Sequence, residues 1–159
     1  ASFALGDEEW EDNWERTIQT NLKTPALICK WALNRWTKTP SIPGIIINIA
    51  SRAAYRGDTA DFASYAASKG GLAAFTKSIA RSYGKRRITA YTIAPGFVDT
   101  DMAEQVKEVY GEGYLTDDLA LDELTSPEEV AQLVLFLAQG KGRHMTGTTF
   151  HVNAGSYMV

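Results

Sequence analysis

Apolar side chains change their spacing along the 159-residue chain, and each change marks an expected element. Over residues 7–36 they recur at helical intervals behind a run of acidic residues, which predicts a helix with a favourable first turn. Pro25 lies inside this stretch, and we expect it to kink or divide the helix. A continuous β-branched run at 45–50 predicts a strand covered on both faces, as is typical of parallel sheets.

The rest of the chain alternates between helical and extended patterns. Residues 61–83 predict a helix that is small on one side, where two adjacent glycines indicate the close approach of another helix or a ligand. Residues 88–94 predict a second strand, and the acidic stretch at 97–125 is expected to be irregular. A capping box opens a predicted helix over 126–140, and alternation at 148–153 predicts a last strand.

This order of elements favours α/β layers around a parallel sheet. No internal repeat or interdomain linker interrupts the sequence, so residues 1–159 are expected to form one unit. Three strands make a thin sheet, and the first would keep an unpaired edge that invites aggregation. The pattern therefore predicts that something pairs beside residues 45–50.

Composition and charge narrow the classes of function. The net charge of −3 argues against a nucleic-acid partner, because phosphate binding needs a concentrated cationic surface. Cys29 is the single cysteine, so no intrachain disulfide is expected, and a reducing cytoplasmic compartment fits. We expect a soluble protein without a signal peptide or a membrane span. His144 and His151 lack the spacing of metal ligands, so no catalytic metal is expected.

Tyr65 and Lys69 are the central candidates for chemistry. On the predicted helix they lie four positions apart, on one face, where both can line the same cleft. A free Tyr has a pKa of about 10, and a neighbouring cation lowers it, so such a pair can exchange a proton with a carbonyl or alcohol oxygen. Tyr and Lys also occur at this spacing by chance, and a solvated helical face is the alternative for an isolated match.

Further candidates flank this pair. Ser51 ends the first strand at the carboxyl edge, where α/β folds place ligands, although a Ser that only opens a turn has the same pattern. Asn21 is a poor helix former inside a predicted helix, which indicates either a functional role or a side chain that satisfies backbone groups freed by Pro25. Pro95 and Gly96 follow the second strand, where bare backbone would admit a flat ligand.

Together these residues resemble the classical branch of the short-chain dehydrogenase/reductase family. The match rests on Asn-Leu at 21–22, Ile-Ile-Asn-Ile-Ala-Ser at 46–51, Tyr-Ala-Ala-Ser-Lys-Gly-Gly-Leu at 65–72, Ala-Pro-Gly-Phe-Val-Asp-Thr at 94–100, and Met-Thr-Gly and Val-Asn-Ala-Gly within 145–155. It covers nearly the whole chain and implies a Rossmann-like, doubly wound parallel sheet. The family's Gly-rich pyrophosphate turn follows no predicted strand here, so the N-terminal nucleotide-binding half of that fold is expected to be absent from this chain.

The resemblance implies a role for each candidate. Tyr65 would be the general acid/base, Lys69 would lower its pKa and hold the nicotinamide ribose, and Ser51 would orient the substrate oxygen. Asn21 would hold a water in a proton relay to Lys69. The cofactor would be NAD or NADP, and residues 97–125 would form a mobile substrate loop. The residues lining the nicotinamide side would be Tyr65, Lys69, Pro95, Gly96, Val98 and Thr100.

Two functions stay open at this point. The chain is either part of an NAD(P)-dependent oxidoreductase acting on a small carbonyl or alcohol, or a catalytically incompetent half-domain stabilised by association with itself or a partner. Family members commonly pair through helices that resemble residues 7–36 and 61–83, so a dimeric or tetrameric homo-oligomer is expected. The isolated chain is expected to bind dinucleotide weakly or not at all. A loop containing Arg52, Tyr55 and Arg56 should shape the substrate pocket.

Overall fold

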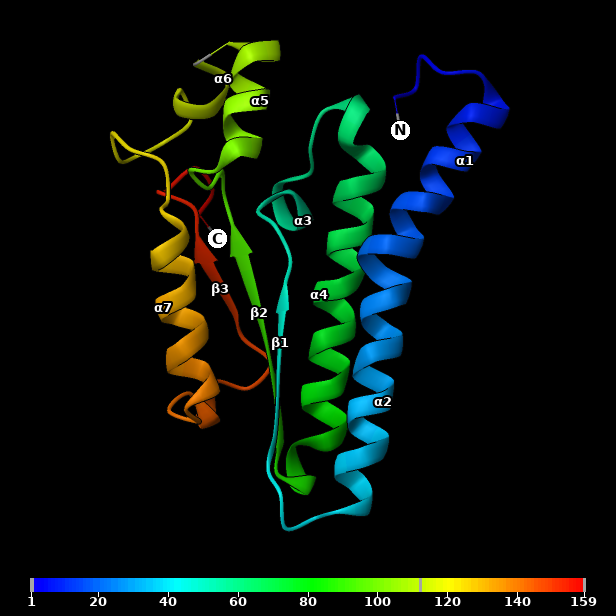
Figure 1. Ribbon diagram of the computed structural model, residues 1–159, viewed down its shortest axis with the longest axis vertical. Helices are drawn as coiled ribbons and strands as arrows, with labels where there is room; N and C mark the ends of the chain where they lie inside the picture. Colours follow the sequence, from blue (N-terminus) through cyan, green and yellow to red (C-terminus); the bar gives the residue numbers. More distant parts are fainter. Residues whose placement is uncertain (1, 112, 159) are drawn as a thin grey trace.

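The computed structural model describes residues 2–111 and 113–158 as a parallel sheet between two layers of helices (Figure 1). The strands in this part of the chain are β1 (Gly44–Ile49), β2 (Ile88–Pro95) and β3 (Thr149–Val152). They are hydrogen-bonded in the order β1-β2-β3, and both pairings are parallel. The predicted α/β class and the three predicted strands are confirmed.

The core lies on both faces of this sheet. On one face, a buried cluster packs α2 (Thr24–Lys38) and α4 (Ala63–Tyr83) against the strands. On the other face, α7 (Pro127–Ala138) packs around the fully buried side chains of Tyr91 and Leu137. β1 is thus covered on both faces, as its β-branched run predicted, while its outer edge pairs with no strand among the described residues.

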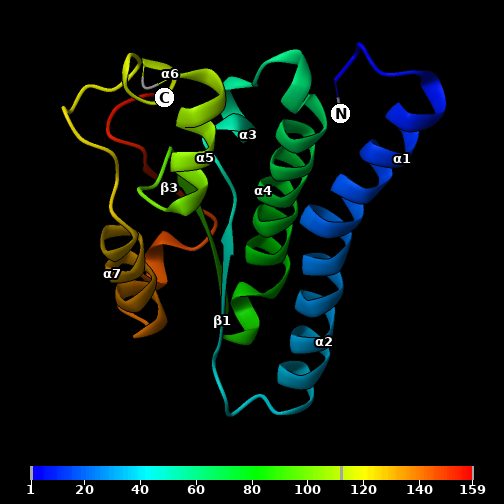
Figure 2. The same ribbon diagram turned by 45° about the horizontal axis from the view of Figure 1, so that its top comes forward.

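The predicted first helix is a long rod that contains one wider turn. α1 (Asp7–Ile18) leads through a π-helical turn at Gln19–Lys23 into α2 (Figure 2). Pro25 has no N–H, and in an α-helix its ring would clash with the carbonyl of Asn21. The wider turn relieves that conflict, because the Thr24 N–H donates to the carbonyl five residues back. Pro25 therefore divides the rod as predicted.

α4 lies along this rod, and its glycines let neighbouring elements approach. A Cβ added at Gly71 would stand 2.9 Å from the Leu22 side chain, and one at Gly70 would stand 3.5 Å from the Ala54 carbonyl. Glycine destabilises a helix interior, and here the closer packing offsets that loss. The close approach of Leu22 accounts for Gly71, whereas a Cβ at Gly70 would make only an ordinary contact.

The predicted last helix has the expected start. Ser126 and Glu129 form a capping box, in which each side chain accepts the other's backbone N–H, at 3.3 Å and 2.8 Å. α7 ends at Ala138, two residues before Gly140, where the predicted helix ends. Short 3-10 helices complete the described secondary structure at Ala60–Phe62, Gly84–Arg86 and Arg143–Met145.

Two segments expected to be loops contain helices. α3 (Ala53–Arg56) follows β1, and α5 (Asp101–Tyr110) precedes α6 (Gly113–Thr116). The prediction that 97–125 is irregular was wrong, because acidic residues there alternate with apolar ones at helical spacing. Gly111 adopts a positive φ of 88° and ends α5.

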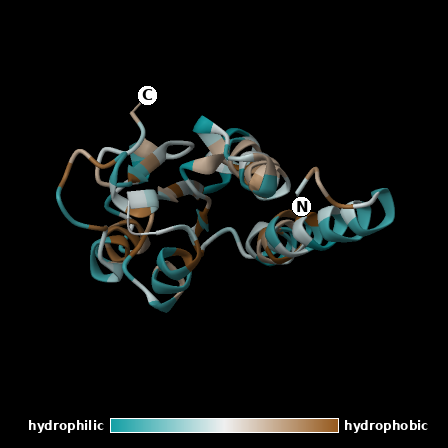
Figure 3. Cartoon of the chain, turned by 90° about the horizontal axis from the view of Figure 1, so that it is seen from above, coloured by the Kyte–Doolittle hydropathy of each residue, from teal (hydrophilic) through white to brown (hydrophobic). Residues whose placement is uncertain are grey.

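The rod differs in polarity between its projecting end and the part that meets the core. Seen from above, α1 projects to one side of the layers and is largely hydrophilic (Figure 3). Cys29 on α2 is 5% exposed and lies in the core. Within the described part of the chain, no helix combines the length and apolar content needed to cross a bilayer.

Candidate active site

A cavity of about 500 Å³ opens where β1 and β2 end. At this end of the sheet α3 and α5 lie together (Figures 1 and 2). This is the carboxyl edge of the parallel strands, where α/β folds bind ligands. The predicted residues that line it are Ser51, Tyr65, Lys69, Pro95, Gly96, Val98 and Thr100. The structure therefore brings together every predicted site residue except Asn21.

Tyr65 lies in the first turn of α4 with its phenol hydrogen-bonded to the hydroxyl of Ser51. The Ser51 hydroxyl also accepts the Ala53 N–H at 3.2 Å, which holds it at the start of α3. Burial raises the pKa of Tyr65, the bond to Ser51 lowers it in part, and the charge of Asp58 raises it further. The phenol is therefore protonated at neutral pH and can donate a proton.

Lys69 lies one turn further along α4. Its Nζ donates to the Ile49 carbonyl at 3.0 Å and lies 5.7 Å from the centroid of the Tyr65 ring. Burial lowers the pKa of Lys69. We expected the cation to lower the pKa of Tyr65, but Lys69 is not among the groups that shift it, and desolvation of the phenol, the largest cause, raises that pKa.

Asn21 lies apart from this group, half-buried in the π-helical turn of the rod. This turn packs against α4, where Leu22 meets Gly71. The Asn21 carbonyl loses its usual helical partner because Pro25 has no N–H, which matches the backbone explanation for an Asn at this position. Its role in a proton relay stays a prediction.

The turn after β2 holds the residues predicted to line the nicotinamide side. The Gly96 N–H donates to the Val152 carbonyl at 2.9 Å, and the Thr100 hydroxyl donates to the Val98 carbonyl at 3.2 Å. A Cβ added at Gly96 would stand 2.9 Å from the Cβ of Asn153. The segment after β3 thus leaves no room for a side chain at Gly96. The close approach of a ligand would be a second reason for a glycine here.

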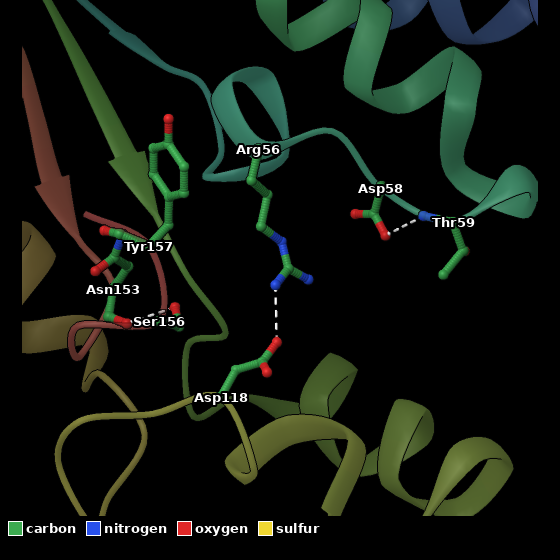
Figure 4. A network of polar contacts seen from close by, with 7 residues as sticks. All are labelled: Arg56, Asp58, Thr59, Asp118, Asn153, Ser156 and Tyr157. Atoms are coloured by element: carbon green, nitrogen blue, oxygen red, sulfur yellow. Dashed lines mark hydrogen bonds and ion pairs between the residues drawn. The ribbon is translucent and has the colours of Figure 1, made fainter. Parts of the chain in front are cut away.

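The loop after β1 contributes residues that the sequence did not mark. Asp58 and Phe62 line the cavity, and the charge of Asp58 acts on Tyr65. In Figure 4, the Asp58 carboxylate accepts the Thr59 N–H at 2.8 Å. A polar residue in a loop has no distinctive sequence signal, so only the fold reveals that Asp58 faces the site.

An ion pair fastens this loop across the molecule. Arg56 Nη1 lies 2.8 Å from Asp118 Oδ2, which joins α3 to the segment between α6 and α7 (Figure 4). In the same view, the turn after β3 is closed by the Asn153 amide donating to the Tyr157 carbonyl at 2.9 Å and by the Ser156 hydroxyl donating to the Asn153 carbonyl at 2.7 Å. These bonds hold the rim of the carboxyl edge in place.

Known proteins are similar to this chain in sequence. The family described as enoyl-(acyl carrier protein) reductase matches residues 6–157, and the chain belongs to this short-chain dehydrogenase/reductase family. The chain is 39% identical to 3-oxoacyl-(acyl-carrier-protein) reductase FabG of Pseudomonas aeruginosa over 148 residues, which cover 93% of this chain and 58% of that protein. It is 38% identical to FabG of Escherichia coli strain K12 over 155 residues, which cover 98% and 60% of the two chains.

Solved structures of 4-hydroxyisoleucine dehydrogenase share the fold. One is a mutant complexed with NADH and succinate, with a TM-score of 0.83 and 28% identity, covering 96% of this chain and 61% of that one. Another is complexed with NADH and has a TM-score of 0.80 and 27% identity. The chain thus spans about three fifths of the length of its relatives, and its Rossmann-like class is confirmed over that part.

Proposed function

We propose that this chain forms the catalytic end of an NAD(P)-dependent oxidoreductase, which transfers hydride between a nicotinamide and a carbonyl or alcohol carbon. The observation that carries the proposal is the convergence of Ser51, Tyr65 and Lys69 on one cavity at the carboxyl edge of the sheet. Membership of the family and the NADH-bound structural relatives support the same chemistry.

Tyr65 exchanges the proton with the substrate oxygen. During reduction that oxygen gains negative charge, and the neutral, buried phenol donates its proton to it. Ser51 holds the same oxygen beside the phenol, because its hydroxyl can donate to one oxygen while accepting from another group. During oxidation the phenolate removes the alcohol proton, so this direction is favoured as the pH rises.

Lys69 acts mainly on Tyr65. Its ammonium stabilises the phenolate that remains after reduction, because an opposite charge nearby favours the ionised form. An ammonium has three N–H donors, and the bond to the Ile49 carbonyl leaves donors for the hydroxyls of a cofactor ribose. Asn21, in the π-helical turn beside α4, holds a water that relays protons to Lys69.

The residues after β2 suit one end of a nicotinamide cofactor. Pro95 and Val98 offer apolar surface to a flat ring, and Thr100 adds a hydroxyl. When bound, the nicotinamide supplies or accepts the hydride. Among residues 2–111 and 113–158, no strand leads through a Gly-rich turn into a helix, so the pyrophosphate end finds no counterpart there. The contacts that select NAD or NADP belong with that other end.

A cofactor and carbonyl screen tests the proposal. The purified full-length polypeptide is assayed with NADH and NADPH against ketones and aldehydes, with the Tyr65→Phe variant in parallel. We expect cofactor oxidation that depends on both the carbonyl compound and Tyr65. A protein that binds reduced cofactor tightly but turns over none of the panel would contradict the proposal.

A groove between α2 and α4 favours a second candidate function. It encloses about 440 Å³, and Leu27, Leu33 and Phe75 are among its apolar walls. Beyond the groove lining, Ile28 and Trp31 on α2 add apolar surface that is 57% and 65% exposed. Exposed apolar surface of this kind marks association sites. In this reading, the chain is a catalytically incompetent half-domain that persists by pairing this face with a copy of itself or with a partner.

Intact mass and sedimentation separate the two candidates. A denatured mass well above 17.4 kDa means that further chain carries the cofactor end, which favours the oxidoreductase. A mass of 17.4 kDa, with self-association and no cofactor binding, favours the half-domain. Self-association alone fits both, because the same face can form a homo-oligomer of an active enzyme.

A further inference from the structure

One nitrogen of a cation in the cavity wall lacks a hydrogen-bond acceptor among the described residues. Arg52 directly follows Ser51, lines the cavity and is only 5% exposed. Its Nη1 is buried and has no hydrogen-bond partner among the residues that the structure describes. A buried guanidinium nitrogen without an acceptor is costly, because it has lost water and gained no partner. An unpaired nitrogen of this kind is available to donate a hydrogen bond to a ligand.

The neighbouring carboxylates are engaged with other groups. Asp118 pairs with Arg56 at 2.8 Å, and Asp58 accepts the Thr59 N–H at 2.8 Å (Figure 4). Burial lowers the pKa of Arg52, the charge of Arg56 lowers it further, and the charges of Asp118 and Asp58 oppose this shift without reversing it. The acidic side chains around Arg52 therefore compensate only part of its desolvation.

Stacking accounts for the face of the guanidinium but not for its edge. The Arg52 Cζ lies 4.5 Å from the centroid of the Phe97 ring, and Phe97 lines the same cavity. The N–H donors of a guanidinium lie in its plane, so an aromatic ring against the face leaves them unpaired. A side chain that served only to pack on Phe97 could be apolar and would avoid the desolvation.

We propose that Arg52 binds a carboxylate of the substrate, so that the site acts on oxo acids or hydroxy acids in preference to neutral carbonyls and alcohols. This inference rests on the proposed function, because it assigns a substrate class to the same site. The planar fork of the guanidinium matches the two oxygens of a carboxylate. Since Ser51 and Arg52 are adjacent, one small substrate can place its carbonyl at Ser51 and Tyr65 and its carboxylate at Arg52.

Matched substrates test the inference. The kcat/KM is measured for oxo acids with the carbonyl at successive distances from the carboxylate, each against its methyl ester. We expect the native protein to prefer at least one acid by about 10- to 100-fold, the range of a hydrogen bond to a charged group. Arg52→Met should abolish that preference by slowing the acid alone. Arg81→Met removes the same charge from an exposed position on α4 and should keep the preference.

Equal kcat/KM for acid and ester in the native protein, or an equal loss of both in Arg52→Met, would overturn the inference. Arg52→Lys serves if the Met variant does not fold, and it should retain only part of the preference because it lacks the planar fork. Turnover of esters without acids overturns the inference and leaves the proposed function intact.

If nothing is turned over, the proposed function fails. Calorimetry with succinate and succinamide then decides separately whether Arg52 binds a carboxylate. Binding of succinate alone, lost in Arg52→Met, supports a carboxylate site. Equal binding of both compounds, or of neither, overturns it.

Discussion

The cavity at the sheet edge and the groove between α2 and α4 are similar in volume, at about 500 and 440 Å³, but differ in chemistry. Arg52, Tyr65 and Lys69 all line the first, and burial shifts the pKa of each against its charged form. Apolar surface predominates in the walls of both spaces, so the difference lies in the ionisable groups that burial acts on in the cavity. Volume alone therefore does not identify a reactive site, whereas several desolvated ionisable groups facing one space do.

One helix serves both spaces, which makes matched substitutions possible. The first turns of α4 present Tyr65 and Lys69 to the cavity, and its last turns present Ile79 and Tyr83 to the groove. A change at either end alters one space while the other acts as an internal control.

The largest effect is expected from removal of one hydroxyl. Tyr65→Phe should lower kcat for carbonyl reduction by about 10²- to 10⁴-fold, because the proton donor is lost. Tyr83→Phe makes the same chemical change in the groove and should leave kcat close to the native value. Steady-state rates with saturating cofactor provide the comparison, and equal losses in the two variants would remove the distinction between the two spaces.

Truncation of a core side chain that lines the groove should lower stability and leave catalysis intact. Leu33 is 6% exposed and belongs to the cluster between α2 and the sheet. Leu33→Ala should lower the free energy of unfolding by about 2–5 kcal/mol, through lost burial and a new cavity. Urea denaturation measures the change. The activity per folded molecule should persist, so a variant that is fully folded but inactive would contradict this division of roles.

Lys69 should control the pH dependence of alcohol oxidation. This direction needs the Tyr65 phenolate, and burial raises the pKa of Tyr65, so kcat/KM should rise with pH throughout the neutral range. Removing a stabilising cation raises that pKa further, so Lys69→Met should shift the profile to higher pH by about 1 unit or more. A profile that keeps its midpoint in the variant would show that Lys69 does not act on the phenol.

The smallest effect on catalysis is expected at the rim of the groove. Leu27 lines the groove and is 37% exposed. Leu27→Glu places a charge on this apolar face and should weaken self-association by about 10-fold or more in Kd. Sedimentation at several concentrations measures this change. Unaltered association would exclude this face as the contact between copies.

Local patterns predicted the elements and part of the site for identifiable reasons. The β-branched run before Ser51 and the small face of α4 can be recognised from the spacing of their residues. Tyr65 and Lys69 share a helical face because they lie four positions apart. The helix at Asp101–Tyr110 was missed because its acidic residues resemble those of a loop. The direction of the Tyr65 pKa shift was also missed, because burial and the position of Asp58 depend on tertiary packing.

Transfer of a labelled hydride tests most directly whether the Tyr65 site reduces a carbonyl group. Reduced nicotinamide carrying deuterium at its transferable position is incubated with a carbonyl substrate and either native protein or Tyr65→Phe, and the product is analysed by mass spectrometry. The proposed site predicts deuterium on the former carbonyl carbon with the native protein, formed far more slowly with the variant. Product without deuterium, or equal rates of transfer in both proteins, would contradict it.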